Sequence, residues 1–487
     1  LRQYAEEQLA AAGEAETTHD THSHYYTRFM IQRENDLKGG QQLEALREIE
    51  ADWENIRAAF RRLIQQRDYH VARLLLDSLG LAYWQLNRER EGEDYFAAIV
   101  RAVPAEPTSE LRHLLAHLLV WNGVCAMTHW DIAFPLLRRA DSLAREYQDA
   151  TISGVALMRI GMWMLYMTPD DLPEGTRLIR EAIQIFRDAG EPYWEAFALW
   201  LLSRFHSQND HWEEAYAVGQ EALMLCQQTH NVMRMGFVLR YLGIYAANLG
   251  KWQECNSYLD QSLSVFQSVG SHSGLHEAYY DKSVLRLIDG DFSSAIEYAH
   301  KSLFHARAIN YPGQTTDSLQ LVAEISLVQS RYANAIRFTR EAIQTMVDAD
   351  APLIRCEFIT PILEACGRYG LGENDAAAAL VREHFVPWNT HYELLHFSVR
   401  LVIYHLLGLA YLLADAGEGE RALELVSYAV NNPKTPDWWV EREPLTVKLL
   451  ARLKGCLSPA QYTTAWERGK SLDLNTALAA LLELPNP

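Results

Sequence analysis

The chain has 487 residues, too many for one ordinary compact core, and this length indicates several domains or a repeat array. Hydrophobic residues make up 49% and charged residues 22%, which excludes a disordered chain. The 44 Lys and Arg against 63 Asp and Glu give a net charge of −19 with no basic block, which argues against direct nucleic-acid binding.

The six cysteines are scattered and include no C-x-x-C pair, so we expect neither a zinc site nor a disulfide framework. We interpret them as buried thiols in a reducing compartment, and since no signal peptide is recognisable we expect a cytoplasmic protein. The most apolar run, at 401–414, is shorter than the roughly 18 residues that cross a bilayer and contains His405. It predicts a buried helix, and we expect no membrane association.

Residues 1–68 predict a helical arm. The chain begins LRQYAEEQLAAAGEAE, without Met and already in a helical pattern, so we expect a piece of a longer polypeptide. Within the segment IEADWENIRAAFRRLIQQRD at 49–68, one helical stripe carries Trp53, Ile56, Phe60, Leu63 and Ile64. Such a stripe has to be covered. We favour packing inside this chain, and the alternative is a docking face for a domain outside it.

Residues 69–440 predict a solenoid with a forty-residue period. The segment GKWQECNSYLDQSLSVF at 250–266 is restated in side-chain size as GDFSSAIEYAHKSLFHA at 290–306. Counting by forty gives an aromatic position (Trp212, Trp252, Phe292, Tyr332), a small position (Ala215, Cys255, Ala295, Ala335) and an aliphatic position (Leu143, Ile183, Leu223, Leu263, Leu303, Ile343). Such a period is typical of a repeat array.

Each repeat predicts two helices, as at 235–250 and 252–270, because apolar residues recur every three or four positions without β-branched alternation. Gly270 is expected to end the second helix, and Gly250 and Gly290 to supply a positive φ at tight turns. The small residue would let the helices of a pair approach closely. The aromatic residue would fill the gap to the next repeat.

These residues resemble the tetratricopeptide family, whose pattern is L-G, then G-x-aromatic, small, large, small. The copy that carries the resemblance best contains Leu242, Gly243, Gly250, Trp252, Cys255, Leu259 and Ser262. Segments near 407–429 and 79–83 look like further copies. Armadillo and HEAT arrays have similar periods, but the Gly-aromatic-small turn favours the tetratricopeptide interpretation. The resemblance implies an all-α fold, a right-handed superhelical solenoid of antiparallel helix pairs.

Residues 441–487 predict capping helices, and the two ends of the chain carry a second resemblance. The segment TTAWERGKSLDLNTALAALLE at 463–483 resembles the closing helices of bacterial STAND-type signalling ATPases, including regulators of the LuxR, AfsR and MalT type. The N-terminal arm, with HSHYY at 22–26, resembles the segment that follows the winged helix in those proteins, and 81–96 is similar to their first sensor repeat. The resemblance implies an N-terminal NTPase part of the same polypeptide, outside this sequence.

Motifs for catalysis, cofactors and metals fail on inspection. Gly469–Lys470–Ser471 ends like a phosphate-binding loop, but Thr464 stands where that loop requires glycine. His19, His22 and His24 could hold a metal ion, although a solvated helix start is the interpretation we favour. No Ser, Cys or Thr has a recognisable base and orienting group. We therefore expect no catalytic residue, no cofactor and no metal site.

In a tetratricopeptide superhelix the first helix of each pair lines the concave surface, so the resemblance implies a ligand there. Matching positions of four repeats give three series: Phe197, Phe237, Glu277 and Asp317; Trp200, Arg240, Tyr280 and Gln320; Arg204, Ile244, Val284 and Glu324. Asn248 lies one turn further along. Two arginines beside exposed aromatic rings would hold an anionic or planar group, because Arg offers a fork of donors and stacks on rings. The alternative is that the aromatics pack against neighbouring helices and the arginines are solvated.

The sequence thus predicts a ligand- or protein-sensing domain of a STAND NTPase. As the resemblance implies, a protein, peptide or small-molecule inducer in the groove would relieve autoinhibition and let the ATPase part oligomerise. The alternative is a free-standing tetratricopeptide scaffold that binds a peptide or protein. An all-helical enzyme is the least favoured interpretation.

Overall fold

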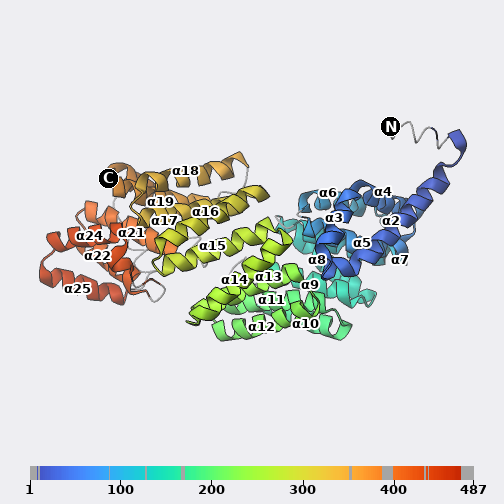
Figure 1. The fold of residues 1–487 in the computed structure, drawn as a ribbon, viewed down its shortest axis with the longest axis horizontal. Helices are drawn as coiled ribbons and strands as arrows, with labels where there is room; N and C mark the ends of the chain where they lie inside the picture. Colours follow the sequence, from blue (N-terminus) through green and yellow to red (C-terminus); the bar gives the residue numbers. More distant parts are fainter. Residues whose placement is uncertain are drawn as a thin grey trace. The chain divides into compact units, whose positions relative to one another are not determined.

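The computed structural model describes residues 8, 11–86, 88–126, 129–165, 171–349, 354–385, 399–432, 435–436 and 438–472. In these residues 24 α-helices follow one another and no β-strand occurs (Figure 1). The chain divides into two compact units, unit 1 at 1–265 and unit 2 at 266–487. This division falls inside the segment expected to be one solenoid, and the expected boundaries at residues 68 and 440 stay predictions.

Unit 1 begins with three helices of the arm and continues in helix pairs. The arm comprises α2 (Ala15–Lys38), α3 (Gln42–Ala51) and α4 (Trp53–Gln66). The pairs are α5 (Tyr69–Gln85) with α6 (Glu89–Arg101), α7 (Ser109–Cys125) with α8 (Trp130–Glu146), α9 (Ala150–Met164) with α10 (Leu172–Ala189), α11 (Pro192–Gln208) with α12 (Trp212–Gln228), and α13 (Val232–Asn248) with α14 (Trp252–Val269). The last of these helices, α14, crosses the boundary between the units.

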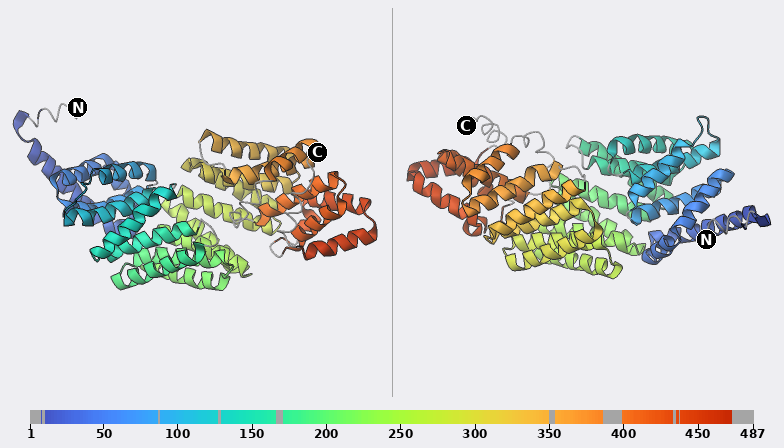
Figure 2. Two further views of the ribbon diagram at one scale, coloured as in Figure 1. Left: turned by 180° about the vertical axis from the view of Figure 1, so that it is seen from behind. Right: turned by 90° about the horizontal axis from the view of Figure 1, so that it is seen from above.

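Unit 2 continues the same alternation and ends in shorter helices. Its pairs are α15 (His272–Ile288) with α16 (Phe292–Ile309), α17 (Pro312–Val328) with α18 (Tyr332–Asp348), α19 (Ile354–Leu371) with α20 (Asn374–Phe385), and α21 (Val399–Asp415) with α22 (Gly419–Asn431). The closing helices are α23 (Trp439–Arg442), α24 (Pro444–Cys456) and α25 (Pro459–Lys470). Within each unit successive helices lie side by side (Figures 1 and 2). The fold is therefore an all-α, tetratricopeptide-like stack of antiparallel helix pairs, as predicted.

The forty-residue period is visible in the backbone. Helices α11, α13, α15 and α17 begin at 192, 232, 272 and 312 and end at 208, 248, 288 and 328. Left-handed residues with φ between 53° and 74° recur twice in each period, at Gly190, His230, Gly270 and Asn310 and again at Asp210, Gly250, Gly290 and Ser330. The expected turns at Gly250, Gly270 and Gly290 are confirmed. Four of the eight positions use residues other than glycine, so the conformation repeats more faithfully than the sequence.

Side-chain sizes explain why the helices pack so closely. All four residues of the small position are at most 1% exposed. A Cβ added at Gly243 would lie 2.9 Å from Leu259 Cγ, which shows how tightly α13 meets α14. The aromatic position behaves less uniformly. The ring of Tyr332 packs against Gly370 of the next pair, as expected, but Trp252 is 46% exposed and does not fill the gap in its copy.

The apolar stripe of the arm is covered within unit 1. Trp53, Ile56, Phe60 and Leu63 are at most 4% exposed, and Ile64 is half-buried. The ring of Trp53 meets that of Tyr83 with centroids 4.6 Å apart. Packing inside this chain, rather than a docking face, is thus confirmed for this stripe.

The remaining expectations concern the apolar run, the cysteines and the glycine–lysine motif. Residues 403–413 of α21 are buried, as predicted, and no helix in the described ranges is long and apolar enough to span a membrane. Cys125, Cys226, Cys255 and Cys366 are buried thiols, whereas Cys456 is exposed at the end of α24, contrary to expectation. Gly469 and Lys470 are the last residues of α25, so they lie at a helix C-terminus rather than in a phosphate-binding loop.

Candidate ligand-binding site

The predicted site residues lie on the first helices of four successive pairs. In unit 1, α11 carries Phe197, Trp200 and Arg204, and α13 carries Phe237, Arg240 and Asn248. In unit 2, α15 carries Glu277 and Tyr280, and α17 carries Asp317, Gln320 and Glu324. The prediction that these positions share a type of helix is confirmed. The residues are divided between the two units, and each group is described separately.

Two of the aromatic side chains in unit 1 are more buried than expected. Phe197 is 2% and Trp200 9% exposed, so neither is the exposed ring that the sequence suggested. The physical reason is a contact with the first repeat of the unit. Trp84, at the end of α5, stacks on Phe197 with ring centroids 5.4 Å apart and an interplanar angle of 11°. Next to this contact, Gln85 Nε2 donates a hydrogen bond to Tyr193 Oη at 3.1 Å, so α5 and α11 are joined at two places.

Two arginines flank this aromatic stack from different helices. The guanidinium carbon of Arg159, on α9, lies 4.4 Å from the ring centroid of Trp84 and 5.1 Å from that of Phe197. That of Arg234, on α13, lies 3.7 Å from Phe197 and 5.0 Å from Trp200. We call Trp84, Arg159, Phe197, Trp200 and Arg234 the arginine–aromatic cluster. It brings together four helices of unit 1.

The electrostatics of this cluster are unusual. Arg159 is 2% exposed. Burial, and after it the positive charge of Arg234, lowers the pKa of Arg159 to about 9, so the guanidinium is still protonated at neutral pH. Burial likewise lowers the pKa of Arg234. Burial penalises the charged form of a base, and a nearby like charge adds to the penalty.

Both predicted arginines, Arg204 and Arg240, lie next to the cluster. Arg204, 7% exposed, lies with its guanidinium carbon 5.1 Å from the ring centroids of both Trp200 and Tyr241. Arg240 is half-buried and lies 4.9 Å from the same Tyr241 ring. The structure therefore brings together Trp200, Arg204 and Arg240 beside cationic and aromatic neighbours. Phe237 is half-buried with its ring 6.5 Å from Trp200, and Asn248 is exposed at the end of α13.

The predicted residues of unit 2 have a different character. Gln320 is 6% exposed and donates a hydrogen bond from Nε2 to Thr360 Oγ1 at 2.9 Å. Glu324 is 1% exposed, and Glu277, Tyr280 and Asp317 are half-buried. This face is acidic and polar, without the guanidinium groups of unit 1.

A buried polar network in unit 1 was not predicted from the sequence. His117 is 2% exposed, and its Nδ1 lies 2.8 Å from Asp77 Oδ1 while its Nε2 lies 2.9 Å from Asp149 Oδ2. His113 Nε2 lies 2.9 Å from the same Asp149 oxygen. Burial by itself lowers the pKa of His117, but the two carboxylates outweigh it and raise that pKa to about 9. Burial raises the pKa of Asp149, but the hydrogen bonds from His117 and His113 outweigh it and hold that pKa well below its usual range.

The residues of this network also have the spacing of a metal-binding group. The ligand atoms of His113, His117 and Asp149 lie within 4.8 Å of one another. The histidines are four residues apart on α7, which places them on one face. The imidazolium form of His117, held between two carboxylates, already satisfies the network without an ion, and Arg73 lies 4.0 Å from Asp149. We interpret it as a structural ion-pair network.

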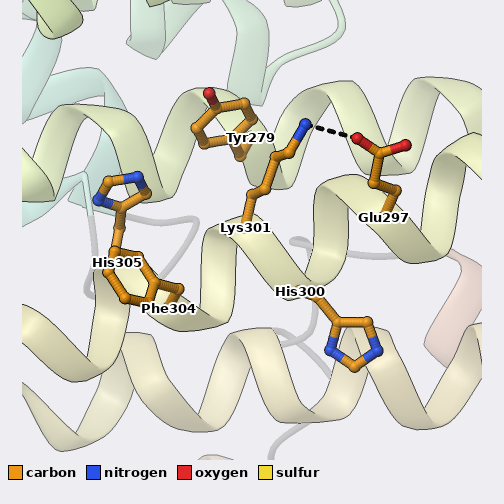
Figure 3. Close-up of a pocket in the computed structure, with 6 residues that line it drawn as sticks. All are labelled: Tyr279, Glu297, His300, Lys301, Phe304 and His305. Atoms are coloured by element: carbon orange, nitrogen blue, oxygen red, sulfur yellow. Dashed lines mark hydrogen bonds and ion pairs between the residues drawn. The ribbon is translucent and has the colours of Figure 1, made fainter.

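A pocket of about 440 Å³ lies in unit 2, outside the predicted series (Figure 3). It is lined by Tyr279 of α15 and by five residues of α16: Glu297, His300, Lys301, Phe304 and His305. Lys301 pairs with Glu297 at 2.5 Å, and the rings of Tyr279 and His305 stack at 5.7 Å. Figure 3 shows the ring of His300 pointing away from this pair. The charges of the pocket are therefore already matched within it.

Sequence reasoning missed Trp84, Arg159 and Arg234. One signal was available, because Arg159 is the only charged residue of α9, whose sequence is ATISGVALMRIGMWM. A lone arginine in an otherwise apolar helix has to be buried or to face something polar. The other two residues carry no such signal.

Comparison with known proteins gives one match at the level of sequence. No family model matches the chain. Regulatory protein AfsR of Streptomyces griseus is 24% identical over 152 residues, which are 31% of this chain and 15% of AfsR. The chain thus spans only a small part of that protein.

Solved structures with a similar fold are more numerous. A STAND protein with a tetratricopeptide repeat sensor from Pyrococcus horikoshii is 16% identical, with a TM-score of 0.46 over 74% of this chain and 54% of that one. Aspartyl phosphate phosphatase F of Bacillus subtilis is 14% identical, with a TM-score of 0.46 over 77% and 95% of the two chains. Human IFIT1 with PPP-AAAA is 12% identical, with a TM-score of 0.48 over 92% and 94%. Identities and TM-scores this low say nothing about function.

Proposed function

We propose that this chain is the sensing domain of a STAND-type signalling NTPase and that its ligand binds to the first helices of unit 1. The observation that carries the proposal is the arginine–aromatic cluster, in which cationic and aromatic side chains from α5, α9, α11 and α13 converge. The predicted residue Trp200 belongs to it and the predicted residues Arg204 and Arg240 extend it, so the binding face would include all three. The local similarity to AfsR supports the same assignment.

The mechanism we propose is a change in how this domain restrains an ATPase part of the same polypeptide. Helix α5 and the arm reach α11, through the Trp84–Phe197 stack and through Lys38, whose Nζ lies 4.0 Å from Glu191 Oε2. A ligand that inserts beside Trp84 would alter this contact between the first repeat and α11. The arm would thereby transmit ligand binding toward the segment that precedes it. A ligand can shift such an equilibrium only by its difference in affinity for the two states.

The test uses the uninterrupted reading frame that contains this chain. We expect a phosphate-binding loop and a winged helix before the arm, and we expect deletion of residues 1–487 to raise basal ATP hydrolysis. Molecules that co-purify with the full-length protein would be identified by mass spectrometry and added back. If the added molecule raises ATP hydrolysis by the full-length parent and by the control Gln261→Ala, a change on the exposed side of α14, the proposal is supported. A reading frame without a phosphate-binding loop would contradict it and favour a free-standing peptide-binding scaffold.

A further inference from the structure

Three buried N–H groups of the arginine–aromatic cluster have no hydrogen-bond acceptor among the residues that the structure describes. They are Nε and Nη2 of Arg159 and Nε1 of Trp200. The remaining terminal nitrogen of Arg159 has only the sulfur of Met162, at 3.9 Å, which is a weak acceptor. Buried polar groups in native proteins are almost always paired, so three unpaired donors in one cluster require an explanation.

The cluster also carries positive charge without a matching carboxylate. Within the described ranges no Asp or Glu forms a hydrogen bond or ion pair with Arg159 or Arg234. Glu89 acts on Arg159 weakly and only through space, and burial raises the pKa of Glu89, so its own charge is disfavoured. Other arginines of unit 1 do find carboxylates, including Arg57, Arg62, Arg88, Arg112, Arg145, Arg177 and Arg187. In a chain of net charge −19, two unmatched guanidinium groups side by side are an exception.

Contacts with aromatic rings compensate this arrangement only in part. A guanidinium over a ring gains on the order of the energy of one ordinary hydrogen bond, whereas withdrawal of a charge from water costs several times as much. Two like charges near each other add to the cost. An anion between the two arginines would neutralise the charge and accept hydrogen bonds from the unpaired donors at once.

We infer that Arg159 and Arg234, together with Nε1 of Trp200, form a binding site for an oxyanion, a carboxylate or phosphate group borne by the ligand of unit 1. This inference rests on the proposed function only in placing the ligand at this face of unit 1. Arginine suits such a group because its fork of donors meets two oxygens at once.

The first experiment measures stability without an added anion. Replacement of Arg159 by Met removes the charge and the unpaired donors and keeps a long apolar side chain. We expect Arg159→Met to raise the midpoint of thermal unfolding by about 2–4 °C in a buffer free of oxyanions. The matched control Arg177→Met removes an exposed arginine that pairs with Glu174 and should leave the midpoint unchanged or lower it. A lower midpoint for Arg159→Met would mean that Arg159 is a structural residue, and the inference would be wrong.

The second experiment adds the anion. Inorganic phosphate and acetate, each at tens of millimolar and constant ionic strength, serve as probes of the two sources of negative oxygen. We expect one of them to raise the midpoint of the parent and of Arg177→Met, and its apparent affinity to fall about 10- to 100-fold in Arg159→Met and in Arg234→Met. Arg159→Lys should recover little, since a point charge lacks the fork. The probe that acts tells a phosphate ligand from a carboxylate ligand.

Phosphate also stabilises proteins in general through exclusion from their surface, so only the difference between variants counts. If both probes leave the parent unchanged, or if parent and Arg159→Met respond equally, there is no oxyanion site in the cluster. This result would leave the sensing role intact, because that role is tested by the upstream reading frame and by ATP hydrolysis. Conversely, the reading frame could encode no NTPase part while the midpoint of thermal unfolding still rises with an anion. That result would support the oxyanion site and contradict the sensing role.

Discussion

The two units place opposite chemistry on equivalent helices. The predicted positions of unit 1 hold Phe197, Trp200, Arg204, Phe237 and Arg240, and those of unit 2 hold Glu277, Tyr280, Asp317, Gln320 and Glu324. In unit 2 a buried carboxylate is matched, since Glu364, 7% exposed, accepts hydrogen bonds from Arg340 and Arg368. In unit 1 the buried Arg159 keeps unpaired donors. The comparison teaches that a buried charge by itself does not indicate a binding face, whereas a buried charge without a partner does.

Unit 2 contains a buried ionisable group that resembles Arg159, and its behaviour sharpens the comparison. Glu443 is fully buried, and its Oε1 has no hydrogen-bond partner in the described part of the chain. Burial raises the pKa of Glu443 to about 7. A carboxyl group in this position avoids the free-energy cost of a buried charge by taking up a proton near neutral pH. A guanidinium cannot become neutral in this way, because it stays protonated throughout the physiological pH range.

The largest expected effect separates a matched arginine from an unmatched one. Arg368→Met removes hydrogen bonds of 3.0 and 2.8 Å to Glu364 Oε1 and leaves that buried carboxylate with the largely exposed Arg340 alone. We expect the free energy of unfolding to fall by about 2–4 kcal/mol, somewhat less than for a fully broken buried ion pair because Arg340 still pairs with Glu364. Urea unfolding of the variant and of the control Arg177→Met provides the measurement. If Arg368→Met stabilises the protein as Arg159→Met is expected to do, the contrast between the units disappears.

The next effect comes from the histidine network of unit 1. Because the folded state raises the pKa of His117 to about 9 from an ordinary value near 6.5, the proton of His117 contributes stability in full below pH 6.5. This contribution is lost as the pH rises from 6.5 to 9. We expect the parent to lose about 3 kcal/mol over this interval, and His117→Gln to lose much less. Chemical unfolding at a series of pH values, with the exposed His70→Gln as control, measures the difference. A parallel decline in all three proteins would refute this assignment.

A second loss of stability with rising pH, at lower pH than that of His117, is expected from Glu443 in unit 2. The unfolded chain ionises this carboxyl near pH 4.5 and the folded chain near 7, so folding becomes less favourable as the pH rises through that interval and is constant above it. The difference between these two pKa values corresponds to about 3 kcal/mol, and the hydrogen bond that the side chain accepts from the backbone N–H of Thr446 is already part of the folded-state value. We expect Glu443→Gln to remove the decline, whereas Glu441→Gln, on the exposed surface, should retain it. Calorimetry from pH 4 to 8 decides between the two.

The smallest change in stability is expected at the edge of the cluster. Arg240 is half-buried on α13, and Arg240→Ala should change the free energy of unfolding by no more than about 0.5 kcal/mol. Its affinity for the natural ligand should nevertheless fall by about 1.5–3 kcal/mol, the scale of a charged hydrogen bond. The control Gln261→Ala should change neither quantity. Equal ligand affinity in parent and Arg240→Ala would limit the site to the buried cluster.

Much of the fold could be predicted because the same set of side-chain volumes recurs at equivalent positions of every repeat. Positions such as Ala215 and Cys255 have to be small wherever two helices touch, and the helices predicted at 235–250 and 252–270 correspond to α13 at 232–248 and α14 at 252–269. Only part of the candidate site could be predicted in this way. Arg204 and Arg240 follow the period, but Trp84 reaches Phe197 across two intervening helix pairs. A repeat pattern describes neighbours, and contacts of this longer range depend on how the pairs of unit 1 turn relative to one another.

The left-handed residues that close the helices also determine how this protein can change in length. Asp210 and Gly250 hold the same conformation forty residues apart, with φ of 56° and 71°, and each leads from a first helix into a second. Deletion or duplication of the segment between two such junctions removes or adds a whole repeat. The order of helix, turn and helix is then preserved. Gene duplication or deletion in steps of forty codons would therefore yield chains that still fold, with a binding surface lengthened or shortened by one repeat.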